Sequence, residues 1–368
     1  MTPFRQILCS VSTVALLLMG GCATTALTGE ETDASDSAGM TVGVGTPVLA
    51  AAETVAVGTA NADAADDPAI WVDATDTSRV VLFGTDKKAG LYTYALDGSV
   101  LQSLPGGQPN NVDLRDGFMI DGRPQVLVGT SDRSPGRFGI ALFIMDPATL
   151  QTRLWGLIPV DLAEPYGLCV GKRGDQFIVV INGTDGQVRQ VAVTVGANGQ
   201  PVGTEQQRFA VGSQTEGCVI DDETGDLYIG EEARGVWRYS TDPARRAQRT
   251  QIGRAPSAML VPDVEGLALL KDASGTWLMA SSQGDSAFAV WKVDGQPTYR
   301  GRFSVVSGGG IDAVTGTDGI AAQGGPVGHY ASGLVMVQDD VDEGTGLEGG
   351  RQNFKLVDWA AIKAALGL

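Results

Sequence analysis

Histidine is almost absent from this sequence, since His329 is the single one among 368 residues. With one histidine, neither a Ser-His-Asp triad nor a phosphohistidine mechanism is credible. The four cysteines form no CxxC pair and no Cys/His cluster, so a zinc site is not expected. Neither Cys169 nor Cys218 is followed by an arginine at the spacing of a cysteine phosphatase. The glycine-rich stretch 308–310 lacks the Gly-Lys-Ser/Thr ending of a P-loop.

Positive charge is also scarce. The chain has 26 Lys and Arg residues against 43 Asp and Glu, a formal net charge of −17 at pH 7. Such an acidic protein is poorly suited to nucleic acid or to anionic lipid surfaces, and we expect neither as a partner. The content of 51 Gly, 16 Pro and 43% hydrophobic residues is that of a globular, turn-rich chain. The excess of carboxylates suits a protein that collects cations.

Long apolar runs are missing as well. The segment Val11–Met19, preceded by Arg5, is too short to cross a bilayer and is typical of a signal-peptide core. It leads through two glycines to Cys22, a pattern similar to a bacterial lipoprotein cleavage site. We therefore predict a lipoprotein signal peptide over residues 1–21 and a lipid on Cys22. The protein is then exported, as an outer-membrane or cell-surface lipoprotein, with plain secretion to the periplasm or medium as the alternative.

The mature chain divides into two parts. Residues 22–52 are rich in Ala, Thr, Gly, Ser and acids without periodicity, which predicts a flexible tether reaching roughly 30 Å. Residues 53–368 form the folded domain. If Cys22 carries lipid, Cys169–Cys218 is the one disulfide that remains possible. Both cysteines stand in apolar, strand-like segments, and we expect two separate buried thiols.

The domain is built from an internal repeat of about 50 residues, a length typical of propellers and similar arrays. Each repeat opens with an acidic or amide residue beside a short apolar run, and a second strand-like run follows that ends in a polar cluster. The openings are Asp66-Asp67-Pro-Ala-Ile-Trp71, Asn110-Asn111-Val-Asp113-Leu, Glu164-Pro-Tyr-Gly-Leu168, Glu216-Gly-Cys-Val219, Asp263-Val-Glu265-Gly-Leu267 and Asp318-Gly-Ile320.

A third strand-like run usually follows, as in Gly90–Tyr94, Gly235–Tyr239 and Ala287–Trp291. Alternating apolar and β-branched or aromatic residues at this spacing predict four-stranded antiparallel blades. Six repeats then give an all-β fold, a six-bladed β-propeller. The last repeat lacks one strand, which the N-terminal segment Glu53–Val57 is expected to supply, closing the ring. The final run Asp358–Leu366 predicts a short amphipathic helix packed outside.

This topology brings the polar residues together. In an antiparallel pair, the start of the first strand and the end of the second lie at the same sheet edge. All openings and endings should therefore meet around one mouth of the central channel. Crowded carboxylates need cations to stay ionised, and oxygen ligands from several loops favour Ca²⁺ over Mg²⁺. Lys87, Lys88, Arg133 and Tyr166 on the same rim suit a phosphate group, so the pattern predicts metal-assisted phosphoryl chemistry.

Several stretches resemble the signatures of the β-propeller phytases, which are alkaline, calcium-dependent enzymes, and they occur in matching order from about residue 53 to about residue 360. They are Asp63-Ala-Ala-Asp-Asp-Pro-Ala-Ile-Trp71, Thr85-Asp-Lys-Lys-Ala-Gly-Leu91, Asn110-Asn-Val-Asp-Leu-Arg115, Gln214-Thr-Glu-Gly217, Leu227-Tyr-Ile-Gly-Glu-Glu232, Asp263-Val-Glu-Gly266, Met279-Ala-Ser-Ser-Gln-Gly284 and Gln352-Asn-Phe-Lys355. The resemblance implies a phosphomonoester hydrolase of the 3-phytase type that releases phosphate from phytate, or from its calcium complex, with calcium ions holding a hydrolytic water.

The resemblance also implies roles for individual residues. Lys87, Arg133 and Tyr166 would contact substrate phosphate, and Glu232 would both bind metal and orient the water. The implied calcium ligands are Glu216, Glu232, Asp263, Glu265 and Gln283, with Asp67, Asp113, Asp312 and Asp339 as further candidates and Glu53 for a structural calcium. We expect a monomer that meets the membrane only through its lipid.

Two departures from the family pattern stand out. Thr184-Asp185 replaces a Lys-acid pair, so one phosphate-binding cation is missing, and Lys172 or Arg173 could take its place. The segment 310–318 carries fewer acids than its family equivalent, which affects the assignment of Asp312. Two other functions fit the acidic rim: a non-catalytic calcium-binding surface propeller, and a lactonase-type hydrolase with a single central calcium. The basic rim favours phosphate chemistry over both.

Overall fold

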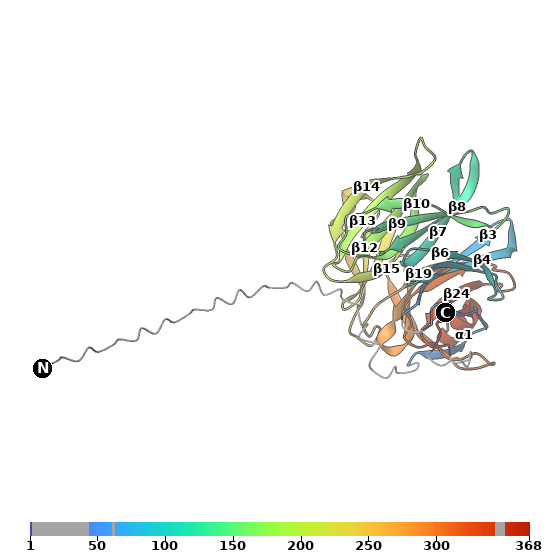
Figure 1. Cartoon of the computed structure of the whole chain (residues 1–368). Helices are drawn as coiled ribbons and strands as arrows, with labels where there is room; N and C mark the ends of the chain where they lie inside the picture. Colours follow the sequence, from blue (N-terminus) through green and yellow to red (C-terminus); the bar gives the residue numbers. More distant parts are fainter. Residues whose placement is uncertain (2–43, 61–62, 343–349) are drawn as a thin grey trace.

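A computed structural model describes Met1 and residues 44–60, 63–342 and 350–368. Six antiparallel sheets follow one another along the chain and are arranged as blades in a ring (Figure 1). The predicted six-bladed propeller is confirmed. No helix within these ranges is long and apolar enough to span a membrane. The predicted signal peptide and Cys22 lie outside the described residues.

Each blade is built on four antiparallel strands, which are ordered from the channel outward. Blade 1 comprises β3 (Ala65–Asp73), β4 (Asp76–Asp86), β5 (Gly90–Tyr94) and β6 (Val100–Pro105), and blade 2 comprises β7 (Pro109–Ile120), β8 (Arg123–Asp132), β9 (Gly139–Met145) and β10 (Thr152–Pro159). Blade 3 comprises β11 (Pro165–Arg173), β12 (Gln176–Gly183), β13 (Gln187–Val195) and β14 (Pro201–Ala210), and blade 4 comprises β15 (Thr215–Asp221), β16 (Asp226–Glu231), β17 (Gly235–Ser240) and β18 (Thr250–Arg254). Blade 5 comprises β19 (Leu267–Asp272), β20 (Gly275–Ser282), β21 (Ala287–Lys292) and β22 (Thr298–Val306).

Blade 6 is completed from the other end of the sequence. Its strands β23 (Ile320–Gly324), β24 (Gly333–Asp339) and β25 (Asn353–Asp358) come from the C-terminal part, and β2 (Ala52–Glu53) pairs antiparallel with β25. The predicted ring closure by the N-terminal segment is therefore confirmed, with a shorter strand than Glu53–Val57. Such closure gives blade 6 the four antiparallel strands on which every other blade is built.

A strand that the sequence did not predict precedes this closure. Residues Thr46–Leu49 form β1, which pairs in parallel with β22 as a fifth strand of blade 5. These residues belong to the range 22–52 that was assigned to a flexible tether, so the ordered domain begins earlier than expected. A short parallel edge strand of four residues is too brief to show a periodic pattern.

The hydrophobic core lies between adjacent blades. One cluster joins blades 2 and 3 through Phe118, Leu142 and Trp155 on one side and Val170 and Phe177 on the other. Apolar side chains that alternate along twisted strands give each sheet two faces to pack against its neighbours. At the C-terminus, α1 (Trp359–Leu366) buries Trp359 and Ile362 against blades 5 and 6. The predicted outer helix is confirmed, with Asp358 as its N-cap.

The two buried cysteines are not separate thiols as expected. Cys169 in β11 and Cys218 in β15 form a disulfide, with their Cα atoms 5.5 Å apart. Cys169 follows Leu168, the first residue of β11 back in the ladder after the bulge, whereas Cys218 is itself the first such residue of β15, so the two cysteines are offset by one position in neighbouring blades. Because successive side chains of a strand point to opposite faces of the sheet, this offset lets them face each other between blades 3 and 4, although 49 residues separate them in sequence.

Candidate active site

The innermost strand of every blade begins with a bulge at the channel mouth. In blades 1–4 the register with the second strand shifts at this point and leaves two residues outside the ladder. In blades 5 and 6 the carbonyls of Gly266 and Gly319 accept hydrogen bonds from Ser281 and Gln338, which gives a similar arrangement. Bulges of this kind re-aim a side chain. The residues at the first bulge position, which we call the inner ring, are Asp66, Asn110, Tyr166, Glu216, Glu265 and Asp318.

A second set of equivalent positions surrounds the first. The residue that follows the second strand of each blade donates its backbone N–H to the carbonyl of a residue close to the start of the first strand, at 2.7 to 3.3 Å. We call these six residues the outer ring, and they are Lys87, Arg133, Thr184, Glu232, Gln283 and Asp340. The outer ring is cationic in blades 1 and 2 and acidic or amide in blades 4–6. Thr184 marks the boundary.

Glycine allows the inner ring to close tightly. Four inner-ring residues are followed by Gly167, Gly217, Gly266 and Gly319. A Cβ atom on Gly167 would lie 1.7 Å from the carbonyl oxygen of Glu216, and one on Gly217 would lie 2.1 Å from that of Glu265. Only a residue without a side chain permits this approach between neighbouring blades.

Three carboxylates form the acidic half of the site. One oxygen each from Glu216, Glu232 and Glu265 lie within 4.8 Å of one another, and all three side chains are buried. Burial, followed by the charges of Glu232 and Glu216, raises the pKa of Glu265 well above its usual range. Neighbouring amides join the group, since Asn110 Nδ2 donates to Glu216 Oε1 at 2.7 Å and Gln283 Nε2 donates to Asp318 Oδ1 at 2.5 Å.

The donor set of this group fits a hard cation. Within the described residues, Glu265 Oε2, Gln283 Oε1 and Asn110 Oδ1 are buried and accept no hydrogen bond. All three are oxygen acceptors, and oxygen is the ligand that Ca²⁺ prefers. In the same part of the chain, thirteen Asp and Glu side chains are buried against three Lys and Arg. Uncompensated buried acids are costly, so a bound cation would relieve this imbalance.

The basic half lies in blades 1 and 2. Lys87 is 2% exposed, and its Nζ lies 2.8 Å from Asp66 Oδ2 and 3.6 Å from Asp318 Oδ2 and also contacts Asp63. Burial works against the charged form of Lys87, but the carboxylates of Asp66 and Asp318 outweigh it and raise the pKa of Lys87 well above its usual range. The Arg133 guanidinium stacks 5.5 Å from the centre of the Tyr166 ring, which fixes its plane.

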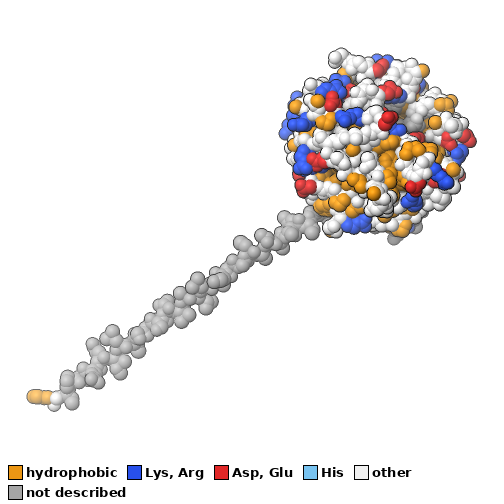
Figure 2. Space-filling view, turned by 90° about the horizontal axis from the view of Figure 1, so that it is seen from above, with side chains coloured by type: hydrophobic (Ala, Val, Ile, Leu, Met, Phe, Trp, Pro, Cys, Tyr) orange, Lys and Arg blue, Asp and Glu red, His pale blue; other side chains and the backbone are white. Residues whose placement is uncertain are grey.

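The negative charge of the site comes from buried side chains and not from a patch on the outer surface. On the face shown in Figure 2, acidic and basic side chains are interspersed rather than gathered into one patch. The buried carboxylates of the two rings instead concentrate negative charge at the channel mouth. A low-dielectric surrounding strengthens their field.

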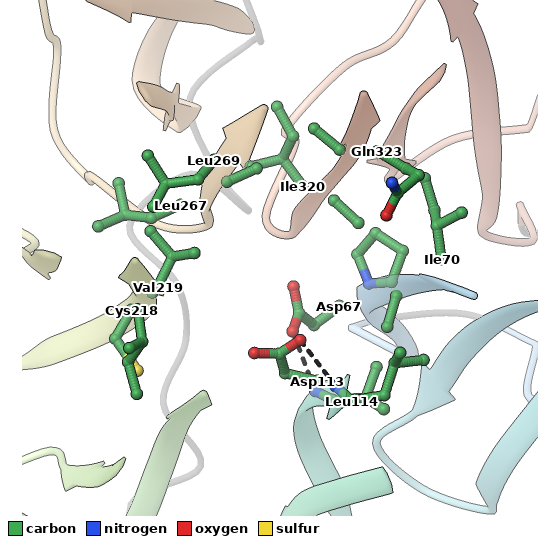
Figure 3. A pocket seen from close by; sticks show the side chains of 18 of the residues that line it. Asp67, Ile70, Asp113, Leu114, Cys218, Val219, Leu267, Leu269, Ile320 and Gln323 are labelled. Carbon is green, nitrogen blue, oxygen red and sulfur yellow. Dashed lines mark hydrogen bonds between the residues drawn. The ribbon is translucent and has the colours of Figure 1, made fainter. Parts of the chain in front are cut away.

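Two predicted metal ligands lie deeper in the channel than the two rings. Asp67 Oδ2 accepts from Val112 N at 2.9 Å, and Asp113 Oδ2 accepts from Val170 N at 2.8 Å. Each carboxylate thereby joins its blade to the next one. Both line a cavity of about 380 Å³, whose opposite wall includes Val219 and Leu267 (Figure 3). Asp113 also pairs with Arg115, so it serves the packing of the channel.

Three other predicted metal ligands form a separate cluster around Lys355. The Nζ of this fully buried lysine lies 2.5 Å from Glu53 and 3.2 Å from Asp339, and it also contacts Asp312. Burial raises the pKa of Asp339 to about 7, against the opposing charge of Lys355. Glu53 and Asp312 also approach Asp342 closely enough to share a metal ion.

Asp263, the remaining predicted ligand, lies beside the outer ring. Its backbone carbonyl accepts from Gln283 N at 3.0 Å, and burial raises the pKa of its carboxyl group. It is not among the three carboxylates that converge, so its predicted role as a ligand receives no geometric support.

The suggestion that Lys172 or Arg173 replaces the cation missing at Thr184 is wrong. Both residues end β11, whereas the site lies at the start of that strand. The Lys172 ammonium instead stacks on Phe177, and Arg173 lies 3.9 Å from Asp242. A strand of nine residues places its two ends on opposite faces of the propeller.

The structure adds residues that were not selected as site candidates. Asp66, Asn110 and Asp318 belong to the inner ring, and Asp63 contacts both Lys87 and, at 3.9 Å, Arg133. The repeat alignment contained a signal for the first three, because they hold the same position in their blades as Glu216 and Glu265. Asp63 had no such signal.

Fold and site together define a β-propeller phosphohydrolase, with buried carboxylates and the cationic side chains of Lys87 and Arg133 facing one channel mouth. A sequence model of the family described as Phytase matches residues 8–368. The chain is 35% identical over 317 residues to the 3-phytase of Bacillus subtilis (strain 168), covering 83% of this chain and 82% of that protein. The chain therefore belongs to the phytase family, whose members release phosphate from phytate, and it is an enzyme with this activity.

Solved structures of unrelated sequence are more distant. Two crystal structures of BBS1N in complex with ARL6DN, soaked with mercury and with lead, align with a TM-score of 0.42 each at 13% and 15% identity. They cover 77% and 76% of this chain and 76% and 75% of theirs. A similarity of this size informs neither the fold nor the function.

Proposed function

We propose that this phytase depends on calcium and that Glu216, Glu232 and Glu265 hold the catalytic ion, with Gln283 as an additional oxygen ligand. The observation that carries the proposal is the convergence of three buried carboxylates within 4.8 Å beside the buried ammonium of Lys87. When bound there, Ca²⁺ would polarise a water molecule and neutralise charge on the phosphate oxygens. The alternatives of a non-catalytic propeller and a lactonase give no reason for a basic half of the outer ring.

The chain's own residues would divide the remaining work. Lys87 and Arg133 bind the phosphate oxygens of phytate as charge-assisted hydrogen-bond donors. The stacking of Arg133 on Tyr166 orients the guanidinium and places the tyrosine against the same phosphate. Glu232, in the outer ring opposite these cations, orients the attacking water. Positioning and electrostatic stabilisation are the main contributions that a protein makes to phosphoryl transfer.

Calcium also accounts for the match between an acidic enzyme and a polyanionic substrate. The chain carries a formal charge of −17 and would repel free phytate. A calcium complex of phytate reduces that repulsion, so we propose it as the form that binds. The Glu53, Asp312 and Asp342 group is a candidate for a second, structural calcium site next to the ammonium of Lys355.

The test uses Glu265→Gln, which keeps the shape of the side chain and removes one negative charge from the centre of the group. We expect calcium affinity, measured by calorimetry on chelator-stripped protein, and phosphate release from phytate both to fall by about 100-fold. Glu223→Gln is the matched control, because Glu223 is 79% exposed and pairs only with Lys271 within the described residues. Full phosphate release by wild-type enzyme in excess EGTA would rule the proposal out.

We further propose that the protein is exported and anchored through a lipid on Cys22, without requiring a partner chain. The support is the sequence pattern of residues 1–22. Mass spectrometry of the mature N-terminus tests it, since an unmodified or uncleaved N-terminus contradicts lipidation.

A further inference from the structure

The disulfide joins the two halves of the active site. Cys169 lies three residues after Tyr166 in β11, and Cys218 lies two residues after Glu216 in β15. Cys218 stands on the wall of the central cavity (Figure 3). The covalent bond therefore connects the strand that presents the tyrosine of the phosphate side with the strand that presents a carboxylate of the metal side.

The junction of blades 3 and 4 is held differently from the two junctions of blade 6. Between blades 5 and 6, Gly266 N donates directly to the Asp318 carbonyl at 3.0 Å, and between blades 6 and 1, Gly319 N donates to the Asp66 carbonyl at 3.1 Å. At the junction of blades 3 and 4 the corresponding N–H, that of Gly167, donates to Asn182 Oδ1 at 3.0 Å. Asn182 Nδ2 then donates to the Glu216 carbonyl at 2.9 Å. A side chain thus relays the contact on which the position of Glu216 depends, as Ser131 does at the junction of blades 2 and 3, and only the junction of blades 3 and 4 adds a disulfide within the described residues.

A relay through a side chain is a looser constraint than a direct backbone bond, because its length depends on rotatable bonds. The disulfide adds a fixed connection within two residues of Glu216, at Cα atoms 5.5 Å apart. The Glu216 carboxylate must in turn stay within 4.8 Å of the oxygens of Glu232 and Glu265 to form the convergent group. A shift of blade 4 against blade 3 would also change the hydrogen bond that the Glu216 carboxylate accepts from Asn110 of blade 2.

We propose that the Cys169–Cys218 disulfide is a positioning device that holds Glu216 in register with Tyr166 and thereby sets the calcium affinity of the active site. This inference rests on the proposed calcium-dependent function. It assigns the pair a role in the reaction beyond the stabilisation that any cross-link gives by restricting the unfolded chain.

The test compares wild-type protein with Cys169→Ala/Cys218→Ala. We expect calcium affinity, measured by calorimetry on chelator-stripped protein, to fall by about tenfold, the size typical of losing support around a metal ligand. Phosphate release from phytate should fall at limiting calcium and return to the wild-type kcat at saturating calcium. Rescue by the ion distinguishes positioning from a general loss of folded protein.

The control is Ile144→Ala in β9, a buried side chain in the packing between blades 2 and 3. It should lower the melting temperature without changing calcium affinity. If the double variant does not fold, folded wild-type protein reduced with a phosphine, with its free thiols confirmed by alkylation and mass spectrometry, is titrated instead. Unchanged calcium affinity without the disulfide would overturn this inference, whereas wild-type protein that binds no calcium would overturn the proposed function.

Discussion

At the scale of single residues, the outer ring shows how the repeat assigns charge. One backbone position, defined by the same hydrogen bond in six blades, carries Lys87 and Arg133 on one side and Glu232 and Asp340 on the other. Identical backbone geometry means that the side chain alone decides whether a blade presents a positive or a negative charge at the channel mouth. Thr184 is the one hydroxyl residue in this series, and it lies between the cationic and the acidic blades. A single substitution there can therefore move the boundary between the basic and the acidic half of the ring.

We expect Thr184→Lys to extend the basic half of the ring and to lower the KM for phytate by about fivefold at low ionic strength, since an added charge pair contributes up to about 1 kcal/mol. The value of kcat should change little. Steady-state kinetics at two salt concentrations check this, because screening should reduce the gain. Gln200→Lys, which adds the same charge at the far end of blade 3, is the control. An equal effect of both substitutions would contradict a local contact.

Gly167 determines how closely blades 3 and 4 approach. In Gly167→Ala the new Cβ would start 1.7 Å from the carbonyl oxygen of Glu216, so the blades must separate. We expect a loss of stability of about 1–3 kcal/mol from overpacking, measured by urea unfolding, together with weaker calcium binding. Gly129→Ala, whose Cβ would meet a Val170 methyl at 3.1 Å, should cost less and leave calcium binding unchanged. Wild-type calcium affinity in Gly167→Ala would contradict this view of the ring.

At the scale of elements, one carboxylate of blade 5 accepts two hydrogen bonds from α1. Asp272, at the end of β19, accepts from Trp359 Nε1 and Lys363 Nζ, both at 2.9 Å, and from Trp277 Nε1 at 3.1 Å. Burial opposes its ionisation, but the hydrogen bonds from Ser274, Trp359 and Lys363 outweigh it and hold the pKa of Asp272 far below the usual range.

We therefore expect Asp272→Asn to lower the free energy of unfolding by about 1.5–3 kcal/mol, the range for hydrogen bonds to a charged group. Because the folded-state pKa is depressed, this contribution is complete above the unfolded-state value of about 4 and is lost as the pH falls below it. Urea unfolding at pH 7, 5 and 3.5 should show a constant difference between wild type and variant at the first two values and a smaller one at the third. Lys363→Met, which removes only the ion pair, should lose less. A difference that grows in acid would contradict the assignment.

The strands β1 and β2 make the N-terminal segment part of two blades. β1 adds an edge to blade 5 and β2 completes blade 6, where Glu53 contacts Lys355. The start of the folded domain is therefore coupled to the cluster around Lys355. This coupling crosses about 300 positions of sequence, and it exists because a ring must join its two ends.

At the scale of the whole molecule, calcium should bind the folded chain and not the unfolded one. Ions with this preference stabilise the folded state by about 2.7 kcal/mol at a free concentration 100 times Kd, and they raise the melting temperature accordingly. We expect EGTA to lower the melting temperature by about 5–10 °C, measured by calorimetric scanning, given about 2–4 °C per kcal/mol for a domain of this size. Asp312→Asn separates the two candidate sites, since it should reduce only the share that depends on the Lys355 cluster. Equal melting temperatures with and without the chelator would count against both sites.

The repeat made much of this architecture predictable. The alternation of apolar residues identified the strands, and their spacing identified six blades. The acidic openings predicted that residues such as Glu216 and Glu265 meet at one channel mouth, and the structure confirms that these two converge. The depth of Asp67 and Asp113 was not predictable, because it depends on where the bulge ends: Asp67 lies in the bulge beside Asp66, whereas Asp113 is already back in the ladder opposite Gly129. The pairing of Cys169 with Cys218 was missed because the two are offset by one position in their repeats, and only the packing of blade 3 against blade 4 turns such side chains toward each other.

The sequence alone determined the class of fold, the family and the face on which the site lies, because these depend on local periodicity and on repeated positions that survive without knowledge of contacts. The tertiary structure decided which carboxylates converge on one another and which serve as links between blades. It also decided that Lys355 draws Glu53, Asp312 and Asp339 into a separate cluster. Those outcomes depend on distances between residues up to about 300 positions apart, and such distances are fixed only when the ring closes and the blades pack.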